Sequence, residues 1–113
     1  MRKRIYISGP MSQGDWDRNI AQGIAVFRQL LGLRKYSTVC PHLSGLMPGC
    51  QDIPASEWYE NDLGLVEVMD AVIRLPGPSV GGDLECDLAR DRGIVVVGSI
   101  EEMEEHFAKE AKQ

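Results

Sequence analysis

The sequence predicts an α/β fold with a parallel sheet, on two observations. Short runs of β-branched and aromatic residues alternate with longer segments whose apolar residues recur at helical spacing. The connections between them are rich in Gly, Pro and Ser, which break regular structure. This alternation is typical of a doubly wound three-layer domain, Rossmann-like or flavodoxin-like, with helices on both faces of a parallel sheet of four or five strands.

The strand predictions depend on short apolar runs that end in turn residues. The first run, Ile5-Tyr6-Ile7, is followed by a Ser-Gly-Pro turn, and the last, residues 94–97, is the most apolar segment of the chain. The four predicted strands are residues 5–7, 37–40, 71–75 and 94–97.

A helix is expected after each strand. In the first, apolar residues between Ile20 and Leu31 recur on one face, and the second is expected to run from Glu57 to Glu67. Ser99 is followed three residues later by Glu102, the spacing of a capping box. The residues expected to cap the four helices are Asp15, Ser56, Ser79 and Ser99.

Composition favours a single soluble, cytoplasmic domain spanning residues 1–113. Apolar residues make up 43% of the chain and charged residues 26%, as in ordinary globular proteins. The net charge is −5 and the basic residues are scattered, which argues against binding a nucleic-acid polymer. Three cysteines without metal-ligand spacing indicate reduced thiols. The charged start predicts no signal peptide, and no apolar run is long enough to span a membrane.

Ligands of parallel sheets bind beyond the carboxyl ends of the strands. The predicted loops at those ends cover residues 8–14, 41–55, 76–82 and 98–99. The second is the longest, and loops of that length in a small domain are often functional. We therefore expect the site among these loops.

The segment Pro78-Ser79-Val80-Gly81-Gly82-Asp83-Leu84-Glu85 lies between a strand and a helix. Its glycines allow close approach of a ligand to the backbone, and a helix N-terminus attracts anions. The pattern predicts a seat for a phosphate or carboxylate, although a tight turn capped by Ser79 is the plainer reading. Glu85 could act as a nucleophile or could be a solvated acid on the helix face.

Two further segments contain candidate site residues. Tyr6 to Met11 is a strand followed by a loop of small residues, and the Tyr6 hydroxyl could point into the site or could only pack. In the segment Glu57 to Asp62, Trp58 accompanies three acids, and the plainer reading is an exposed acidic face with Trp58 packed on the core. Asp62 and Asp70 are both candidates for an acid near the site.

Taken together, these segments resemble the nucleoside 2-deoxyribosyltransferase superfamily, and in particular its short branch of phage and bacterial proteins. The resemblance covers nearly the whole chain. Its motifs are Tyr6 to Met11 (Y-I-S-G-P-M), Trp58 with Asp62, Asp70-Ala71-Val72, and the S-x-G-x-x-x-E pattern from Ser79 to Glu85.

The resemblance implies a role for each matching residue. Glu85 would attack the anomeric carbon of the sugar, Tyr6 would hold Glu85 in place, and Asp62 would contact the sugar or assist departure of the base. Serine at the Ser79 position is typical of the nucleotide-hydrolysing branch, where it binds the 5′-phosphate. The expected catalytic residues are Glu85, Asp62 and Tyr6, and the expected substrate-binding residues are Ser8, Gly9, Pro10, Met11, Ser79, Gly81 and Gly82.

The expected function is cleavage of the N-glycosidic bond of a nucleoside 5′-monophosphate. The alternatives are a nucleoside 2-deoxyribosyltransferase, a glycosidase for another ligand, and a module that binds a nucleotide without cleaving it. The expected partner is a small nucleotide or nucleoside, and no metal or organic cofactor is required. The resemblance also implies a homodimer or a larger homo-oligomer.

Overall fold

Four β-strands and four α-helices alternate along the chain, which confirms the predicted α/β fold. A computed structural model describes all 113 residues. The strands are β1 (Lys3–Ser8), β2 (Tyr36–Val39), β3 (Ala71–Arg74) and β4 (Val95–Val97). The α-helices are α1 (Trp16–Gly32), α2 (Ala55–Val66), α3 (Val80–Asp91) and α4 (Ile100–Ala111), and two short 3₁₀ helices are η1 (Pro41–Leu46) and η2 (Cys50–Asp52).

The strands form one parallel sheet in the order β2-β1-β3-β4. The chain moves outward from β1 to β2 and then crosses back to β3 on the other side of β1. In the register, Tyr6 of β1 is paired with Val39 of β2 and with Val72 of β3. The direction of winding therefore reverses between β1 and β3, and such a reversal opens a crevice at the carboxyl ends of the two strands.

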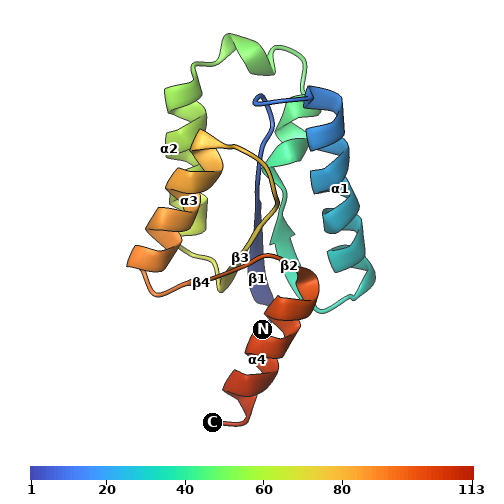
Figure 1. The fold of residues 1–113 in the computed structure, drawn as a ribbon, viewed down its shortest axis with the longest axis vertical. Helices are drawn as coiled ribbons and strands as arrows, with labels where there is room; N and C mark the ends of the chain where they lie inside the picture. The colour runs from blue at the N-terminus through green and yellow to red at the C-terminus, as the bar shows by residue number, and fades with distance from the viewer.

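Helices cover both faces of the sheet, which gives three layers (Figure 1). On one face, Ile5 of β1 belongs to an apolar cluster with Leu30 of α1 and Met103 of α4. On the other face, Tyr6 packs in a second cluster with Cys86 of α3. Successive side chains of a strand point to opposite faces, so β1 contributes to both clusters in turn.

Three of the four predicted helix caps are confirmed. The side-chain oxygens of Asp15, Ser79 and Ser99 each accept a hydrogen bond from the backbone N–H three residues later. At the start of α4 the Glu102 carboxylate reaches back to the N–H of Gly98, one residue earlier than in the usual capping box.

The predicted start of α2 is wrong. The helix begins at Ala55, Pro54 occupies the cap position without a side-chain hydrogen bond, and Ser56 falls inside the first turn. Proline suits a helix start because it has no N–H to leave unpaired and its φ is already helical. The preference for serine as a cap was outweighed here by the proline two residues before it.

The segment 41–55, expected to be irregular, contains η1 and η2. His42 of η1 is buried against α1, where Gly23 makes room for it. A Cβ atom on Gly23 would lie 2.3 Å from the imidazole Cγ, closer than any side chain tolerates. A glycine inside a helix lowers helix stability by about 1 kcal/mol relative to alanine. Helix α1 is therefore less stable at Gly23, where the missing side chain leaves space for His42.

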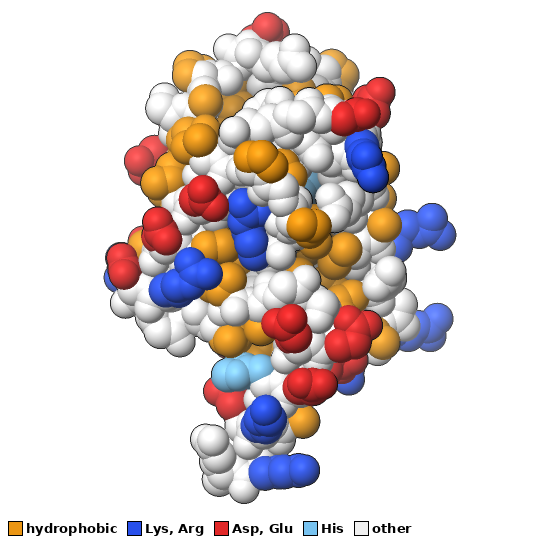
Figure 2. All heavy atoms as spheres, in the orientation of Figure 1, with side chains coloured by type: hydrophobic (Ala, Val, Ile, Leu, Met, Phe, Trp, Pro, Cys, Tyr) orange, Lys and Arg blue, Asp and Glu red, His pale blue; other side chains and the backbone are white.

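The surface carries both charge types (Figure 2). On the visible face, acidic and basic side chains are intermixed, with hydrophobic side chains between them on the side occupied by α2 and α3. None of the helices combines the length and the hydropathy needed to cross a bilayer. All three cysteines are free thiols.

Candidate active site

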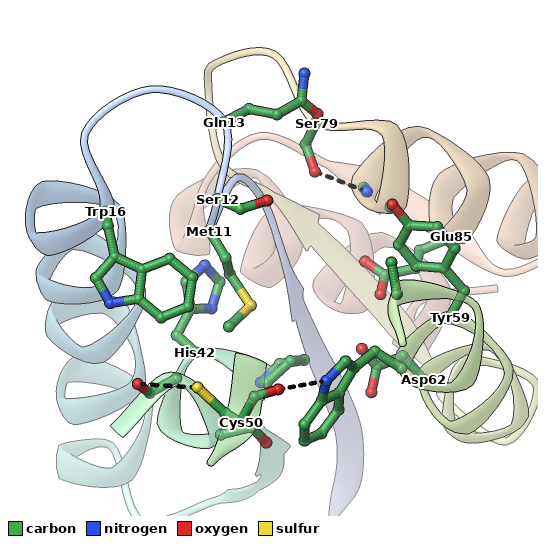
Figure 3. A pocket seen from close by; sticks show the side chains of 18 of the residues that line it. Met11, Ser12, Gln13, Trp16, His42, Cys50, Tyr59, Asp62, Ser79 and Glu85 are labelled. Atoms are coloured by element: carbon green, nitrogen blue, oxygen red, sulfur yellow. Dashed lines mark hydrogen bonds between the residues drawn. The ribbon is translucent and has the colours of Figure 1, made fainter. Parts of the chain in front are cut away.

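A pocket of about 330 Å³ opens at the carboxyl ends of β1 and β3. Small-molecule sites typically have volumes of about 300–1,000 Å³. The walls come from the β1–α1 connection, the segment between β2 and α2, α2 itself, and the first turns of α3. Met11 and Trp16 lie on one side and Asp62 and Glu85 on the other (Figure 3). The pocket therefore occupies the crevice that the strand order predicts.

Glu85 is held at the wall of this pocket by two hydroxyl groups of β1. The Tyr6 hydroxyl donates to Glu85 Oε2 at 2.6 Å, and the Ser8 hydroxyl donates to Oε1 at 2.7 Å. Tyr6 and Ser8 are two residues apart in the strand, so both point to the face covered by α3. Each carboxylate oxygen thus has its own donor, and the orientation of the group is determined before any ligand binds.

Burial governs the electrostatics of this group. Only 8% of Glu85 is exposed, and this burial raises its pKa to about 7, although the bonds from Tyr6 and Ser8 favour the charged form and oppose the rise. The pKa of Tyr6 is raised by burial and by the neighbouring Glu85 carboxylate. Tyr6 consequently stays protonated and remains a hydrogen-bond donor across the physiological range.

Asp62 is a second carboxyl group in the same pocket. It projects from α2, is half-buried, and lies on the same side as Glu85 (Figure 3). Burial raises its pKa, while a hydrogen bond from the Asn61 side chain favours the charged form. Two carboxyl groups with raised pKa values in one pocket can divide the roles of nucleophile and proton donor.

The first turn of α3 forms another part of the wall. Ser79 caps the helix, and its hydroxyl oxygen accepts from the N–H of Gly82 at 2.9 Å. Gly81 lies against the ring of Tyr59, where an added Cβ would come within 3.1 Å. No lysine or arginine lines the pocket. An anion would therefore be attracted by helix N-termini rather than by cationic side chains, and the start of α3 is one of these N-termini.

Arg74 reinforces this turn from outside the pocket and was not among the predicted site residues. Its guanidinium donates to the carbonyl oxygens of Leu75 and Gly77 and pairs with Asp83 at 3.2 Å. An added Cβ on Gly82 would meet that guanidinium at 3.0 Å. Arg74 thus ties the connection after β3 to the start of α3, and nothing in the sequence pattern around it predicted this contact.

Three aromatic residues complete the pocket walls, and two of them, Trp16 and Tyr59, were missed by sequence reasoning. Trp16 is the first residue of α1 and lines the pocket from the start of that helix. Trp58 and Tyr59 precede Asp62 by four and three residues in α2, a spacing that places them on the same helix face. That spacing could have identified them as neighbours of Asp62, whereas no local signal could have identified Trp16.

His42 is a buried residue of the pocket lining, although a lone histidine in a loop is more often exposed. It is 1% exposed, lines the pocket, and its Nε2 has no hydrogen-bond partner. Burial lowers its pKa, so the imidazole is neutral at physiological pH. A lone histidine in an apparently irregular segment gave no sign of burial, because the glycine that accommodates it lies 19 positions earlier in the chain.

The structure brings most of the predicted residues together at the pocket. Tyr6, Ser8 and Pro10 do not line it. The first two lie behind Glu85, and Pro10 packs against the turn at Gly77. The predicted residues that do line the pocket are Gly9, Met11, Asp62, Ser79, Gly81, Gly82 and Glu85.

Asp70 was a candidate for the site and lies elsewhere. Its carboxylate accepts from the backbone N–H of Arg4 at 2.7 Å and pairs with the Arg4 side chain, at the opposite end of β1. Asp70 therefore joins the beginnings of β1 and β3. The turn after β4, residues 98–99, also contributes nothing to the pocket.

No group of three or more His, Cys, Asp or Glu side chains is arranged to hold a metal ion. No family model matches the chain, and no curated protein matches it. The resemblance to the nucleoside 2-deoxyribosyltransferase superfamily therefore stays a prediction. Three of its four motifs lie in or directly behind the pocket, and the fourth, at Asp70, does not.

Proposed function

We propose that the protein is an enzyme that cleaves the N-glycosidic bond of a nucleoside 5′-monophosphate, releasing the free base and the sugar 5-phosphate. The observation that carries this proposal is the Glu85 carboxylate, buried at a pocket wall and oriented by Tyr6 and Ser8. A module that only binds nucleotides needs no such group. A carboxylate fixed in this way matches the requirement of a reaction with positive charge at the anomeric carbon.

In the proposed reaction, ionised Glu85 attacks C1′ of the sugar. The bond between C1′ and the base nitrogen breaks, its electron pair leaves with the base, and protonated Asp62 supplies a proton to that base. Water then attacks C1′, the ester bond to Glu85 breaks, and a proton of the water returns to Asp62. The raised pKa of Asp62 favours its protonated form, as a proton donor requires, whereas Glu85, with a pKa of about 7, is available as the ionised nucleophile only as the pH rises through that value.

The base and the phosphate of the substrate would contact different walls of the pocket. Trp16 and Met11 offer apolar surface for the base, while the start of α3 at Ser79 offers N–H groups and a hydroxyl for the phosphate. This arrangement would place the sugar between them, beside Glu85. The assignment of the phosphate to Ser79 is what the resemblance implies, and the position of Ser79 in the pocket wall supports it.

A nucleoside 2-deoxyribosyltransferase is the second candidate. It is favoured by the absence of any lysine or arginine from the pocket lining, because a neutral nucleoside would need no cation. In that case a second base would replace water and attack C1′ of the sugar held by Glu85. The nature of the substrate and of the acceptor separates the two candidates.

We also propose that the protein acts in the cytoplasm as a homodimer or larger homo-oligomer. Four large apolar side chains on or beside α2 and α3 are between 37% and 55% exposed, namely Leu65, Val68, Val80 and Leu84. Contact with a second copy would cover such a surface.

Base release from a panel of ribo- and deoxyribonucleosides and their 5′-monophosphates tests the proposal. Products would be separated by chromatography for the wild type, Glu85→Gln, and Asp91→Asn as a control acid exposed on the same helix. We expect release from monophosphates to fall by at least roughly 10³-fold in Glu85→Gln and to be unchanged in Asp91→Asn. Release that survives Glu85→Gln would reject Glu85 as the nucleophile, and no release from any substrate would reject the enzyme.

A further inference from the structure

The start of α3, the proposed phosphate seat, is already occupied by a side chain from a distant segment. The amide oxygen of Gln13 accepts a hydrogen bond from the backbone N–H of Val80 at 2.7 Å. Gln13 belongs to the connection between β1 and α1, 67 positions earlier in the chain. Its side chain crosses the upper edge of the pocket next to Ser79 (Figure 3).

The three N–H groups that open α3 differ in how they are used. The N–H of Gly82 donates to Ser79, that of Val80 donates to Gln13, and that of Gly81 has no protein acceptor. An anion bound there would take the free N–H and compete for the one that Gln13 holds. A charged phosphate oxygen is a stronger acceptor at the positive end of a helix than a neutral amide oxygen.

The Gln13 side chain can leave without unfolding its own loop. The loop backbone is anchored separately, because the Asn19 side chain donates to the carbonyl oxygens of Met11 and Gln13 at 3.1 Å and 2.8 Å. Gln13 itself is exposed, and its only side-chain hydrogen bond is the one to Val80. Rotation of one side chain is therefore enough to open the seat.

A second observation indicates independently that this pocket receives a ligand. His42 lines the same pocket and is buried, yet its Nε2 has no hydrogen-bond partner. Unpaired polar atoms in protein interiors are rare and call for a specific explanation. Because this atom is enclosed by neighbouring side chains, a ligand in the pocket would reach it only after those side chains move.

We propose that Gln13 is a displaceable plug of the anion seat at the start of α3, and that it sets the preference between phosphorylated and unphosphorylated substrates. This inference rests on the proposed function and deepens it. In the empty protein the amide oxygen of Gln13 stands in for a phosphate oxygen. A nucleoside leaves the plug in place, whereas a 5′-monophosphate must displace it.

Titration calorimetry with inorganic phosphate tests the plug without any turnover. In Gln13→Ala the seat is open, and we expect phosphate to bind about two- to fivefold more tightly than in the wild type. In Gln13→Glu a carboxylate holds the Val80 N–H and repels the anion, and we expect binding to weaken at least about tenfold. Gln29→Ala, an exposed glutamine of α1 away from the pocket, controls for loss of a glutamine and should match the wild type.

Weaker phosphate binding in Gln13→Ala would overturn the plug, because Gln13 would then be a ligand of the anion. Unchanged binding in Gln13→Glu would overturn it too, and so would an absence of phosphate binding in every variant. Base release from the same variants separates this inference from the proposed function. Altered phosphate affinity without any base release would leave the plug standing and reject the glycosidase. Base release together with an unaltered phosphate affinity in all variants would support the glycosidase and reject the plug.

Discussion

On one face of β1, Ile5 and Ile7 are completely buried among apolar side chains contributed by α1 and α4. On the other face, Tyr6 and Ser8 are as deeply buried, but both donate hydrogen bonds to the Glu85 carboxylate. Burial is therefore equal on the two faces, and only the chemistry differs. One face contributes apolar packing alone, while the other packs in the second apolar cluster and also holds in place a carboxyl group whose burial in the charged form is unfavourable.

Depth of burial therefore does not distinguish structural from functional residues in this protein. What separates them is hydrogen bonding, because a buried polar group is retained only where it has a partner. Variants that alter one face of β1 and leave the other intact test whether the two faces have independent roles.

The largest expected effect is on the apolar face. Ile5→Ala should lower the free energy of unfolding by about 2–5 kcal/mol, because it leaves a cavity in the main core. The catalytic constant for base release, corrected for the folded fraction, should be unchanged. Urea unfolding with parallel rate measurements checks both, and Leu31→Ala, at an exposed apolar residue of α1 outside the proposed subunit interface, is the matched control. A large loss of rate in the folded protein would show that the two faces are not independent.

On the polar face, Glu85→Gln should stabilise the protein at alkaline pH. The folded-state pKa of Glu85 is raised from 4.5 to about 7, so its full contribution to stability is present below about pH 4.5 and is lost as the pH rises through about 7. Glutamine has no charge to bury and escapes this penalty, which amounts to at most about 3 kcal/mol. Thermal unfolding of both proteins at pH 8 and pH 5 checks the difference.

The variant should melt at a higher temperature than the wild type at pH 8, and the gap should narrow towards pH 5. Equal melting temperatures at pH 8 would mean that Tyr6 and Ser8 offset the burial of the charge completely. The polar face would then stabilise the fold as well as the apolar face does.

A smaller effect is expected for Tyr6→Phe, which removes one donor and leaves the ring packing intact. The rate of base release should fall by about 10- to 100-fold, in line with the loss of a hydrogen bond to a charged group. The bond from Tyr6 favours ionised Glu85, so its loss should also move the acid limb of the pH–rate profile above its position near pH 7.

Tyr36→Phe is the matched control for this change. The Tyr36 hydroxyl also donates to a glutamate, Glu104, at 2.8 Å, but it does so away from the pocket. A shift of the acid limb in Tyr36→Phe, or none in Tyr6→Phe, would contradict the special role of the polar face of β1.

The sequence predicts well what local patterns determine. The strands and the caps at Asp15, Ser79 and Ser99 follow from periodicity and capping preferences, and the location of the pocket follows from the geometry of parallel strands. The choice of Asp62 over Asp70 and of Glu85 over the other acids of its helix came from the resemblance. From the strand pattern alone Tyr6 is compatible with packing or with a place in the site, and packing is the commoner role of a strand tyrosine. Only the resemblance assigns it to Glu85. The partner on the facing helix decides between the two readings.

What could not be predicted depends on contacts between distant segments. The bond from Gln13 to Val80, the place of His42 beside Gly23, and the approach of Trp16 to the pocket all require the folded connections. Glutamine in a loop and glycine in a helix have many uses, and neither residue indicates its partner. Rules based on neighbouring residues contain no information about such pairs.

The alternation in β1 has a consequence for the fidelity of folding. If the strand paired one residue out of register, Tyr6 and Ser8 would be forced into the apolar cluster, and Ile5 and Ile7 would turn towards Glu85. Such a slip would disrupt the core and would at the same time leave the buried Glu85 carboxylate without hydrogen-bond donors. The polar face thus works against misfolding, because a β1 that cannot bind Glu85 also cannot complete the core.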